Sequence, residues 1–196
     1  TVVFERDFGI WRLDLTPGAE PRPLQITLRG AAQGPAAEHL SLSSGFSNLA
    51  LSPDGKKVAF IARGEVFAAP ADGSAPAQRV TSTPAVEDEV TWAPDSRRIA
   101  YTSRRGGAPR IYLFDFVTNE ERAPGAGEGE QATPRFSPDG NRIAWVRDGR
   151  ELVVTDLQNG NERVVAVGHL WKAPFTSPRP LAWSPDGRWL AYFAVD

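Results

Sequence analysis

The sequence predicts an all-β protein, a β-propeller built from four-stranded antiparallel blades. The first observation is a repeated turn, Ser52-Pro53-Asp54-Gly55, which returns as Ala93-Pro94-Asp95-Ser96, Ser137-Pro138-Asp139-Gly140 and Ser184-Pro185-Asp186-Gly187. The second is its spacing, because the four prolines are separated by 41, 44 and 47 residues. The third is that short apolar runs lie between the turns. Repeats of this length, with short strands between turn signals, are typical of propeller blades.

Each copy of the turn is predicted to be a tight hairpin between the first and second strands of a blade. Proline presets φ for the second turn position, aspartate accepts local hydrogen bonds, and glycine takes the left-handed conformation. Ser96 replaces this glycine in the second copy. It is therefore expected to sit with some strain at a positive φ, unless this turn takes another type.

The head of the chain is predicted to form part of a blade, residues 1–30. Its apolar runs predict strands at Thr1–Glu5, Gly9–Leu15 and Arg22–Leu28, and no copy of the turn precedes them. This blade therefore begins at its second strand. Residues 31–46 are rich in Ala, Gly, Pro and Ser and are expected to be a connector, part of which could pair as an extended segment.

Three full blades are expected at 47–82, 88–124 and 131–168, followed by a partial blade at 178–196. The second strand of each places an alanine directly before an aromatic residue. The pairs are Ala59-Phe60, Ala100-Tyr101, Ala144-Trp145 and Ala191-Tyr192. Period-2 alternation puts the two members on opposite faces, so stacked sheets can interdigitate.

The ends of the strands carry two further expectations. Asp14, Asp115 and Asp156 end third strands at one repeated position, which favours hairpin-turn acceptors over catalytic groups. Trp189–Val195 predicts a long apolar second strand with an open edge, through which the chain could self-associate. Head and tail together have one strand too many for one blade. We therefore expect neither end to be natural, and the chain to be about four blades of a larger ring.

Composition excludes several function classes. The chain of 196 residues is 41% hydrophobic, enough for a sizeable core, and its net charge of −2 argues against a nucleic acid partner. No apolar run approaches the roughly 20 residues of a membrane span. The absence of cysteine excludes disulfides and thiol nucleophiles. His39 and His169 lack metal-ligand spacing, and no Gly-x-Ser-x-Gly elbow occurs, so we expect no metal, cofactor or catalytic residue.

The candidate binding site is a face of mixed charge. Connectors that enter first strands and connectors that join second to third strands emerge on the same face of a propeller. The charged residues placed on this face are Glu87, Asp88, Glu89, Arg104, Arg105, Arg135, Arg147 and Arg179. Such a face of mixed charge suits a peptide, which carries both signs of charge. Trp171, in a connector, is the surface aromatic expected to join them, whereas the other tryptophans are expected to pack in or between blades.

The acidic run 87–89 has two other interpretations. It lies just before a predicted first strand, so it could be a solvated loop, or, with Glu128 and Glu130 of the next blade, a carboxylate pair for glycoside hydrolysis. A solvated loop is the simpler interpretation, because loops of this kind accumulate polar residues.

The repeat resembles the PD40 or TolB-type propeller repeat over nearly the whole chain: a strand, Ser-Pro-Asp-Gly, a basic residue, then Ile/Val-Ala-aromatic. Within that set, V-F-E-R-D-F-G-I-W-R-L-D-L, S-G-F-S-N-L-A-L-S-P-D-G-K-K-V-A-F and R-G-E-V-F-A-A-P-A are similar to the N-terminal propeller of bacterial tricorn-like serine peptidases of the S41 class. In that family, propellers precede a PDZ domain and a peptidase core and are thought to admit peptides. No part of the core is matched here, so no catalytic residue is carried over.

The resemblance implies a non-catalytic propeller of a tricorn-like peptidase, which gives scaffold and peptide access. A TolB-like periplasmic module that docks protein partners is the alternative. A propeller hydrolase with its own active site is the third hypothesis. The resemblance implies a periplasmic or secreted location.

Overall fold

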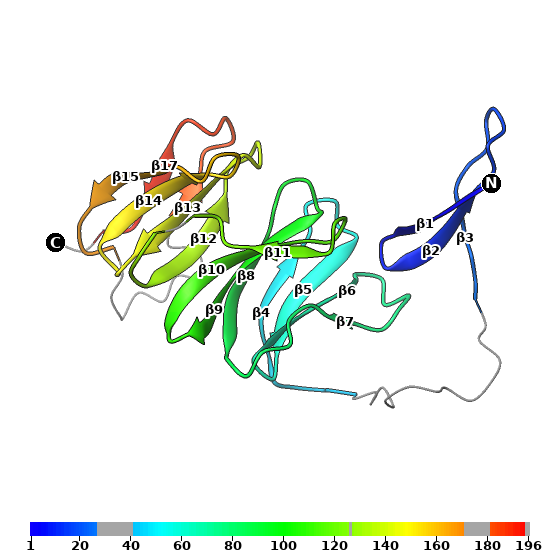
Figure 1. Cartoon of the computed structure of the whole chain (residues 1–196), viewed down its shortest axis with the longest axis horizontal. Helices are drawn as coiled ribbons and strands as arrows, with labels where there is room; N and C mark the ends of the chain where they lie inside the picture. Colours follow the sequence, from blue (N-terminus) through cyan, green and yellow to red (C-terminus); the bar gives the residue numbers. More distant parts are fainter. Residues whose placement is uncertain (27–40, 126, 171–180, 195–196) are drawn as a thin grey trace.

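The computed structural model describes residues 1–26, 41–125, 127–170 and 181–194, and in these residues every regular element is a β-strand (Figure 1). The all-β prediction is confirmed. All strand pairs are antiparallel, and strands adjacent in sequence are adjacent in the sheets. The N-terminal sheet contains β1 (Val2–Arg6), β2 (Gly9–Leu13) and β3 (Arg22–Pro23).

Three four-stranded sheets follow and are called the first, second and third sheets below. The first contains β4 (Phe46–Leu51), β5 (Lys57–Ala62), β6 (Glu65–Pro70) and β7 (Gln78–Arg79). The second contains β8 (Glu87–Trp92), β9 (Arg98–Gly106), β10 (Ala108–Asp115) and β11 (Glu120–Arg122). The third contains β12 (Gln131–Phe136), β13 (Arg142–Arg147), β14 (Glu151–Asp156) and β15 (Glu162–Val167). A hairpin of β16 (Leu181–Trp183) and β17 (Leu190–Tyr192) ends the described chain.

Both ends of the chain form shorter strands than the sequence predicts. β3 has only two residues, because proline cannot donate to a ladder and Pro23 is its second residue. β17 has three, since its described partner β16 starts at Leu181, which pairs with Tyr192. The prediction of a long strand over 189–195 is therefore wrong. Trp189 lies outside the strand and is 72% exposed, so its expected packing role is wrong too.

The repeated turn has the predicted hairpin geometry. Gly55, Gly140 and Gly187 have φ values of 72°, 69° and 68°. Ser96 has a φ of 56°, so of the two alternatives for the second copy it adopts the strained left-handed one. Its hydroxyl compensates by accepting a hydrogen bond from the Asp54 N–H of the neighbouring sheet at 3.1 Å.

The aspartates after the third strands divide into two kinds. Asp115 accepts the Val117 N–H at 2.7 Å, and Asp156 accepts the Gln158 N–H at 2.8 Å, as predicted for turn acceptors. Asp14 differs, because its carboxylate accepts from the Arg12 guanidinium and the Thr1 hydroxyl instead of turn amides.

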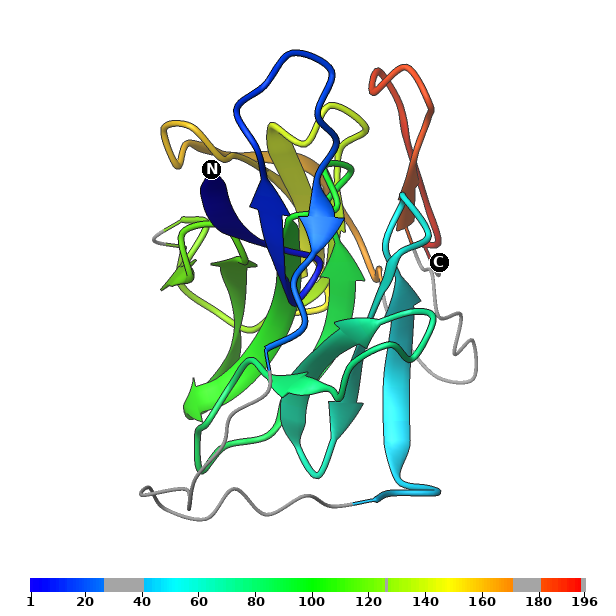
Figure 2. The same cartoon turned by 90° about the vertical axis from the view of Figure 1, so that its right-hand side faces the viewer.

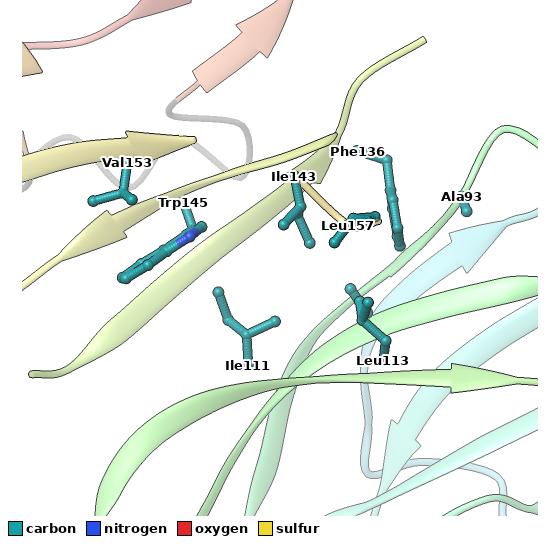
Figure 3. Close-up of a cluster of buried hydrophobic side chains, with 9 residues drawn as sticks. Ala93, Ile111, Leu113, Phe136, Ile143, Trp145, Val153 and Leu157 are labelled. Atoms are coloured by element: carbon teal, nitrogen blue, oxygen red, sulfur yellow. The ribbon is translucent and has the colours of Figure 1, made fainter. Parts of the chain in front are cut away.

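The core lies between the sheets. Ala100 and Ala144 are fully buried, which lets the aromatic and branched side chains of the next sheet approach. Figure 3 shows the cluster between the second and third sheets, where Ile111 and Ile143 lie near Trp145. The Trp145 indole donates to Thr155 Oγ1 at 2.8 Å, so its one polar atom is satisfied in the core.

The arginines after the second and third turns link neighbouring sheets at the edge that carries the turns. Arg98 donates to the Gly140 carbonyl at 3.0 Å, and Arg142 donates to the Gly187 carbonyl at 3.0 Å. Each guanidinium also lies over an aromatic ring of the next sheet, at 5.9 Å from the centroid of Phe136 and 5.0 Å from that of Trp183. These contacts fix the spacing of the blades at this edge.

The N-terminal sheet lies at the opposite end of the molecule from β15 and β17, and it is nearest the viewer in Figure 2. Its hairpin turn contacts the turn edge of the first two sheets. Asp7 forms an ion pair with Lys57 at 2.9 Å, and the ring of Phe8 meets Phe116 edge-on at 5.5 Å.

Candidate functional site

The first strand of each four-stranded sheet carries a β-bulge with a left-handed residue. The pairing register shifts after Ser47, Asp88 and Ala132 in β4, β8 and β12. The left-handed residues are Asn48, Glu89 and Thr133, with φ values of 53°, 56° and 55°. Each lies five residues before the turn proline. Bulges redirect side chains, and such positive φ values are uncommon outside glycine.

The bulges of neighbouring sheets are connected by hydrogen bonds. Asn48 Nδ2 of β4 donates to the Asp88 carboxylate of β8. Asp88 Oδ1 also accepts the Glu89 N–H at 2.8 Å, and Glu89 Oε2 accepts the Thr133 N–H of β12 at 2.7 Å. The left-handed residue of one sheet thus reaches the bulge of the next, which holds the first strands in register across the sheets.

A cleft of about 210 Å³ lies between the second and third sheets, beside the bulges of β8 and β12. Its apolar lining comes from Val86, Pro109, Ala132, Val146 and Leu170. Its charged lining comes from Asp88, Glu89, Glu130 and Arg104. Three carboxylates against one guanidinium give the cleft a negative balance beside an apolar wall.

The inner part of this cleft holds two unusual polar groups. Glu89 is half-buried, and burial raises its carboxyl pKa, helped by Asp88 and opposed by the Thr133 N–H and by Arg135. Thr133 is 7% exposed, and its Oγ1 is buried without a hydrogen-bond partner among the residues that the structure describes. Buried hydroxyls are normally hydrogen-bonded.

Three of the predicted site residues meet at the cleft. Asp88, Glu89 and Arg104 all line it, from the start of β8 and the end of β9. Glu87 does not line it. The interpretation of 87–89 as a solvated loop is wrong, because all three residues belong to β8. The side chain of Glu87 is also buried, and it accepts hydrogen bonds from Ser103 Oγ at 2.9 Å and Thr83 Oγ1 at 2.8 Å.

Arg105 and Arg147 lie away from the cleft lining and pair with acids of their own sheets. Arg105 forms an ion pair with Glu121 at 2.6 Å and lies over the ring of Tyr112 at 4.0 Å. Burial and the hydrogen bond to Glu121 raise the pKa of the Tyr101 hydroxyl. Arg147 pairs with Glu162 and, at 3.2 Å, with Glu151.

The remaining predicted residues have separate positions. Arg135 donates to the Pro134 carbonyl at 2.8 Å and contributes to the electrostatics of Glu89. Arg179, Trp171 and His39 lie outside the described residues. His169 is exposed just after β15.

Thr133 is a polar residue of the cleft that was not among the predicted site residues. Its signal is an alignment, since Asn48, Glu89 and Thr133 are polar residues at one repeated position of the first strands. Within the described parts of the chain, no cluster of three His, Cys, Asp or Glu residues could hold a metal ion. The same parts contain no helix that could cross a membrane.

Comparison with known families agrees with this architecture. The family model of the TolB beta propeller domain, PD40, matches residues 36–196. The chain belongs to this family. The TolB-type propeller resemblance of the repeat is thereby confirmed.

Individual relatives of this PD40 chain include a peptidase and TolB itself. It is 28% identical to dipeptidyl-peptidase 5 of Porphyromonas gingivalis over 124 residues. The matched region is 55% of this chain and 17% of the relative. It is 40% identical to the Tol-Pal system protein TolB of Alcanivorax borkumensis over 62 residues. The matched region is 30% of this chain and 14% of the relative. The chain therefore matches under a fifth of the length of these two proteins.

The solved tricorn protease has the same fold in one part of its chain. It superposes with a TM-score of 0.63 at 17% identity and covers 97% of this chain and 17% of the tricorn chain. This PD40 propeller is thus related to propellers of both TolB and peptidases.

Proposed function

We propose that this chain is the non-catalytic propeller portion of a tricorn-like serine peptidase and provides scaffold and a peptide-binding surface. The observation that carries the proposal is the cleft at the bulges of β8 and β12, where Asp88, Glu89 and Arg104 meet beside apolar side chains. A peptide offers carbonyl oxygens, charged groups of both signs and apolar stems, which match this lining. The partial identity with dipeptidyl-peptidase 5 supports a peptidase context.

The size of the cleft favours a peptide side chain as the occupant. Its volume of about 210 Å³ is below the roughly 300–1,000 Å³ of pockets that enclose whole drug-sized ligands. A peptide lying across the blades would therefore insert one side chain and leave its backbone at the mouth. Arg104 is exposed there and could donate to backbone carbonyl oxygens.

The second candidate is a TolB-like module that docks folded protein partners. It is favoured by the 40% identity with TolB over 62 residues. Both candidates are consistent with the periplasmic or secreted location that we propose.

Binding of unstructured peptides to the intact chain tests the proposal. We expect a labelled peptide library to bind with micromolar to millimolar affinity in fluorescence anisotropy. Arg104→Gln should weaken this binding, whereas Arg163→Gln, an equal charge change on the exposed strand β15, should leave it unchanged. If no peptide binds, or if both variants weaken binding equally, the cleft is not a peptide site and the TolB-like candidate is favoured.

A further inference from the structure

We propose that the cleft between the second and third sheets binds the ammonium group of a peptide lysine side chain, with Glu89 and Thr133 at its inner end. This inference rests on the proposed function, because it names the side chain that a bound peptide inserts. Three features of the cleft carry it: the charge balance, the apolar wall and a buried hydroxyl without a partner.

The charge balance selects a cation. Asp88, Glu89 and Glu130 oppose Arg104, so the lining has two more negative than positive groups. The positions of the charges differ as well. Arg104 is exposed and hydrated, whereas Glu89 is half-buried, where solvent screens its carboxylate less. A cation is therefore attracted past the mouth toward Glu89.

The apolar wall selects a long stem. Val146 and Leu170 are buried, and Ala132 is half-buried beside them. A lysine side chain places four methylene groups along such a surface while its charged end reaches polar partners. A small inorganic cation would leave this wall unused.

The hydroxyl of Thr133 is the independent observation that points to a ligand. Thr133 lines the cleft, is 7% exposed, and its Oγ1 has no partner among the described residues. Its backbone is held in place, since the Thr133 N–H donates to Glu89 Oε2 at 2.7 Å. The hydroxyl oxygen is therefore a preorganised acceptor next to a carboxylate.

An ammonium group matches these acceptors better than a guanidinium group. Ammonium has three donors that rotate about one point, whereas guanidinium donates through a rigid planar fork suited to one bidentate carboxylate. Glu89 already uses Oε2 for the Thr133 N–H. A hydroxyl and carboxylates from different strands are single acceptors, which the three ammonium donors can meet one by one.

The test compares two peptides that differ only in the ammonium group. They are N-acetylated, C-amidated glycine-serine peptides with either lysine or norleucine at the centre, and their binding to the intact chain is measured by isothermal titration calorimetry. We expect the lysine peptide to bind about tenfold more tightly or better, the range of a charge-assisted hydrogen bond. Thr133→Val and Glu89→Gln should each remove most of this preference and leave norleucine binding unchanged.

Matched variants make the outcome specific. Glu128→Gln removes an equal charge from the exposed connector before β12 without changing the cleft lining, so it should keep the preference. Thr133→Ser keeps the hydroxyl and should keep the preference too, which separates loss of the acceptor from a folding defect. Thermal melts confirm that each variant is folded.

The results separate the two proposals. Binding of neither peptide overturns this inference, and the peptide library decides separately whether the proposed function fails too. Equal binding of both peptides leaves the proposed function standing and overturns the lysine site. A lysine preference that survives both Thr133→Val and Glu89→Gln also overturns it, because the ammonium group would then lie elsewhere.

Discussion

The carboxylate of Glu89 in β8 accepts the backbone N–H of Thr133 in β12 at 2.7 Å, across the interface between the second and third sheets. Both residues have left-handed backbones at the same position of their repeats. The bulge therefore has two consequences. It ties one blade to the next, and it places Glu89 and Thr133 in the lining of the cleft.

The first prediction concerns the stability that this hydrogen bond supplies. Glu89→Ala leaves the Thr133 N–H without its acceptor, and Thr133 is buried. We expect the free energy of unfolding to fall by about 1–3 kcal/mol, the cost of an unsatisfied buried donor. Glu89→Gln keeps an acceptor oxygen and should cost under about 1 kcal/mol. Urea denaturation measures both, and equal losses for Ala and Gln would contradict the assignment.

The second prediction concerns the unpartnered hydroxyl of Thr133. Replacement by valine keeps the shape and removes a buried polar group that lacks a partner. In the ligand-free protein, Thr133→Val should therefore leave the free energy of unfolding unchanged or raise it by up to about 1 kcal/mol. Thr81→Val is the matched control, because the buried Thr81 hydroxyl donates to Glu65 at 2.6 Å and accepts the Val66 N–H at 2.9 Å. It should cost about 1–3 kcal/mol, and similar losses in both variants would show that Thr133 has a partner.

The third prediction is sensitivity to acid, which comes from the repeated turns. Burial alone would raise the pKa of Asp54, but hydrogen bonds from Ser52 Oγ and the Lys56 N–H outweigh it and lower the pKa to about 2. The hydrogen bond from Ser137 Oγ likewise lowers the pKa of Asp139. Such carboxylates stabilise the fold above their unfolded pKa of about 3.9 and lose that contribution as pH falls through the folded pKa. We expect the free energy of unfolding to fall from about pH 4 to about pH 2.

The Ser137→Ala variant tests the cause of this acid sensitivity. Ala93 stands at the same position of the second turn, so the fold accepts alanine there. Without the hydroxyl, the pKa of Asp139 should return toward its ordinary value, and the variant should lose less stability than the wild type over this pH range. Urea titrations at several pH values measure the slope. An unchanged slope would assign the acid sensitivity to other groups.

The blades could be predicted from the sequence because their determinants are local. Proline, aspartate and glycine at fixed offsets specify the hairpins, and the alanine-aromatic pair specifies the two faces of β9 and β13. The closeness of Asp88, Glu89 and Arg104 follows from strand order, because the start of β8 pairs with the end of β9.

The rest depended on geometry that no local pattern specifies. The pairing of Arg105 with Glu121 depends on the distance between the end of β9 and the outer strand β11. The burial of Glu87 depends on where β8 starts, and the role of Thr133 on a bulge that shifts the register by one position. A bulge changes which side chains face the cleft, and the polar residues at the three bulge positions differ, so no shared local pattern specifies it.

The last prediction isolates the contact between the turn edges of neighbouring sheets. Gly140 and Gly55 both have left-handed backbones, so an alanine at either position should cost about 1–2 kcal/mol from the backbone alone. A Cβ at Gly55 would meet nothing within 4 Å, whereas a Cβ at Gly140 would lie 3.1 Å from Arg98 Nη2, the group that donates to the Gly140 carbonyl. Gly140→Ala should therefore cost about 1 kcal/mol more than Gly55→Ala, the value of one hydrogen bond. In the Arg98→Met background this difference should vanish, because the displaced guanidinium is absent. A difference that persists in that background would place its cause within the turn and not between the blades.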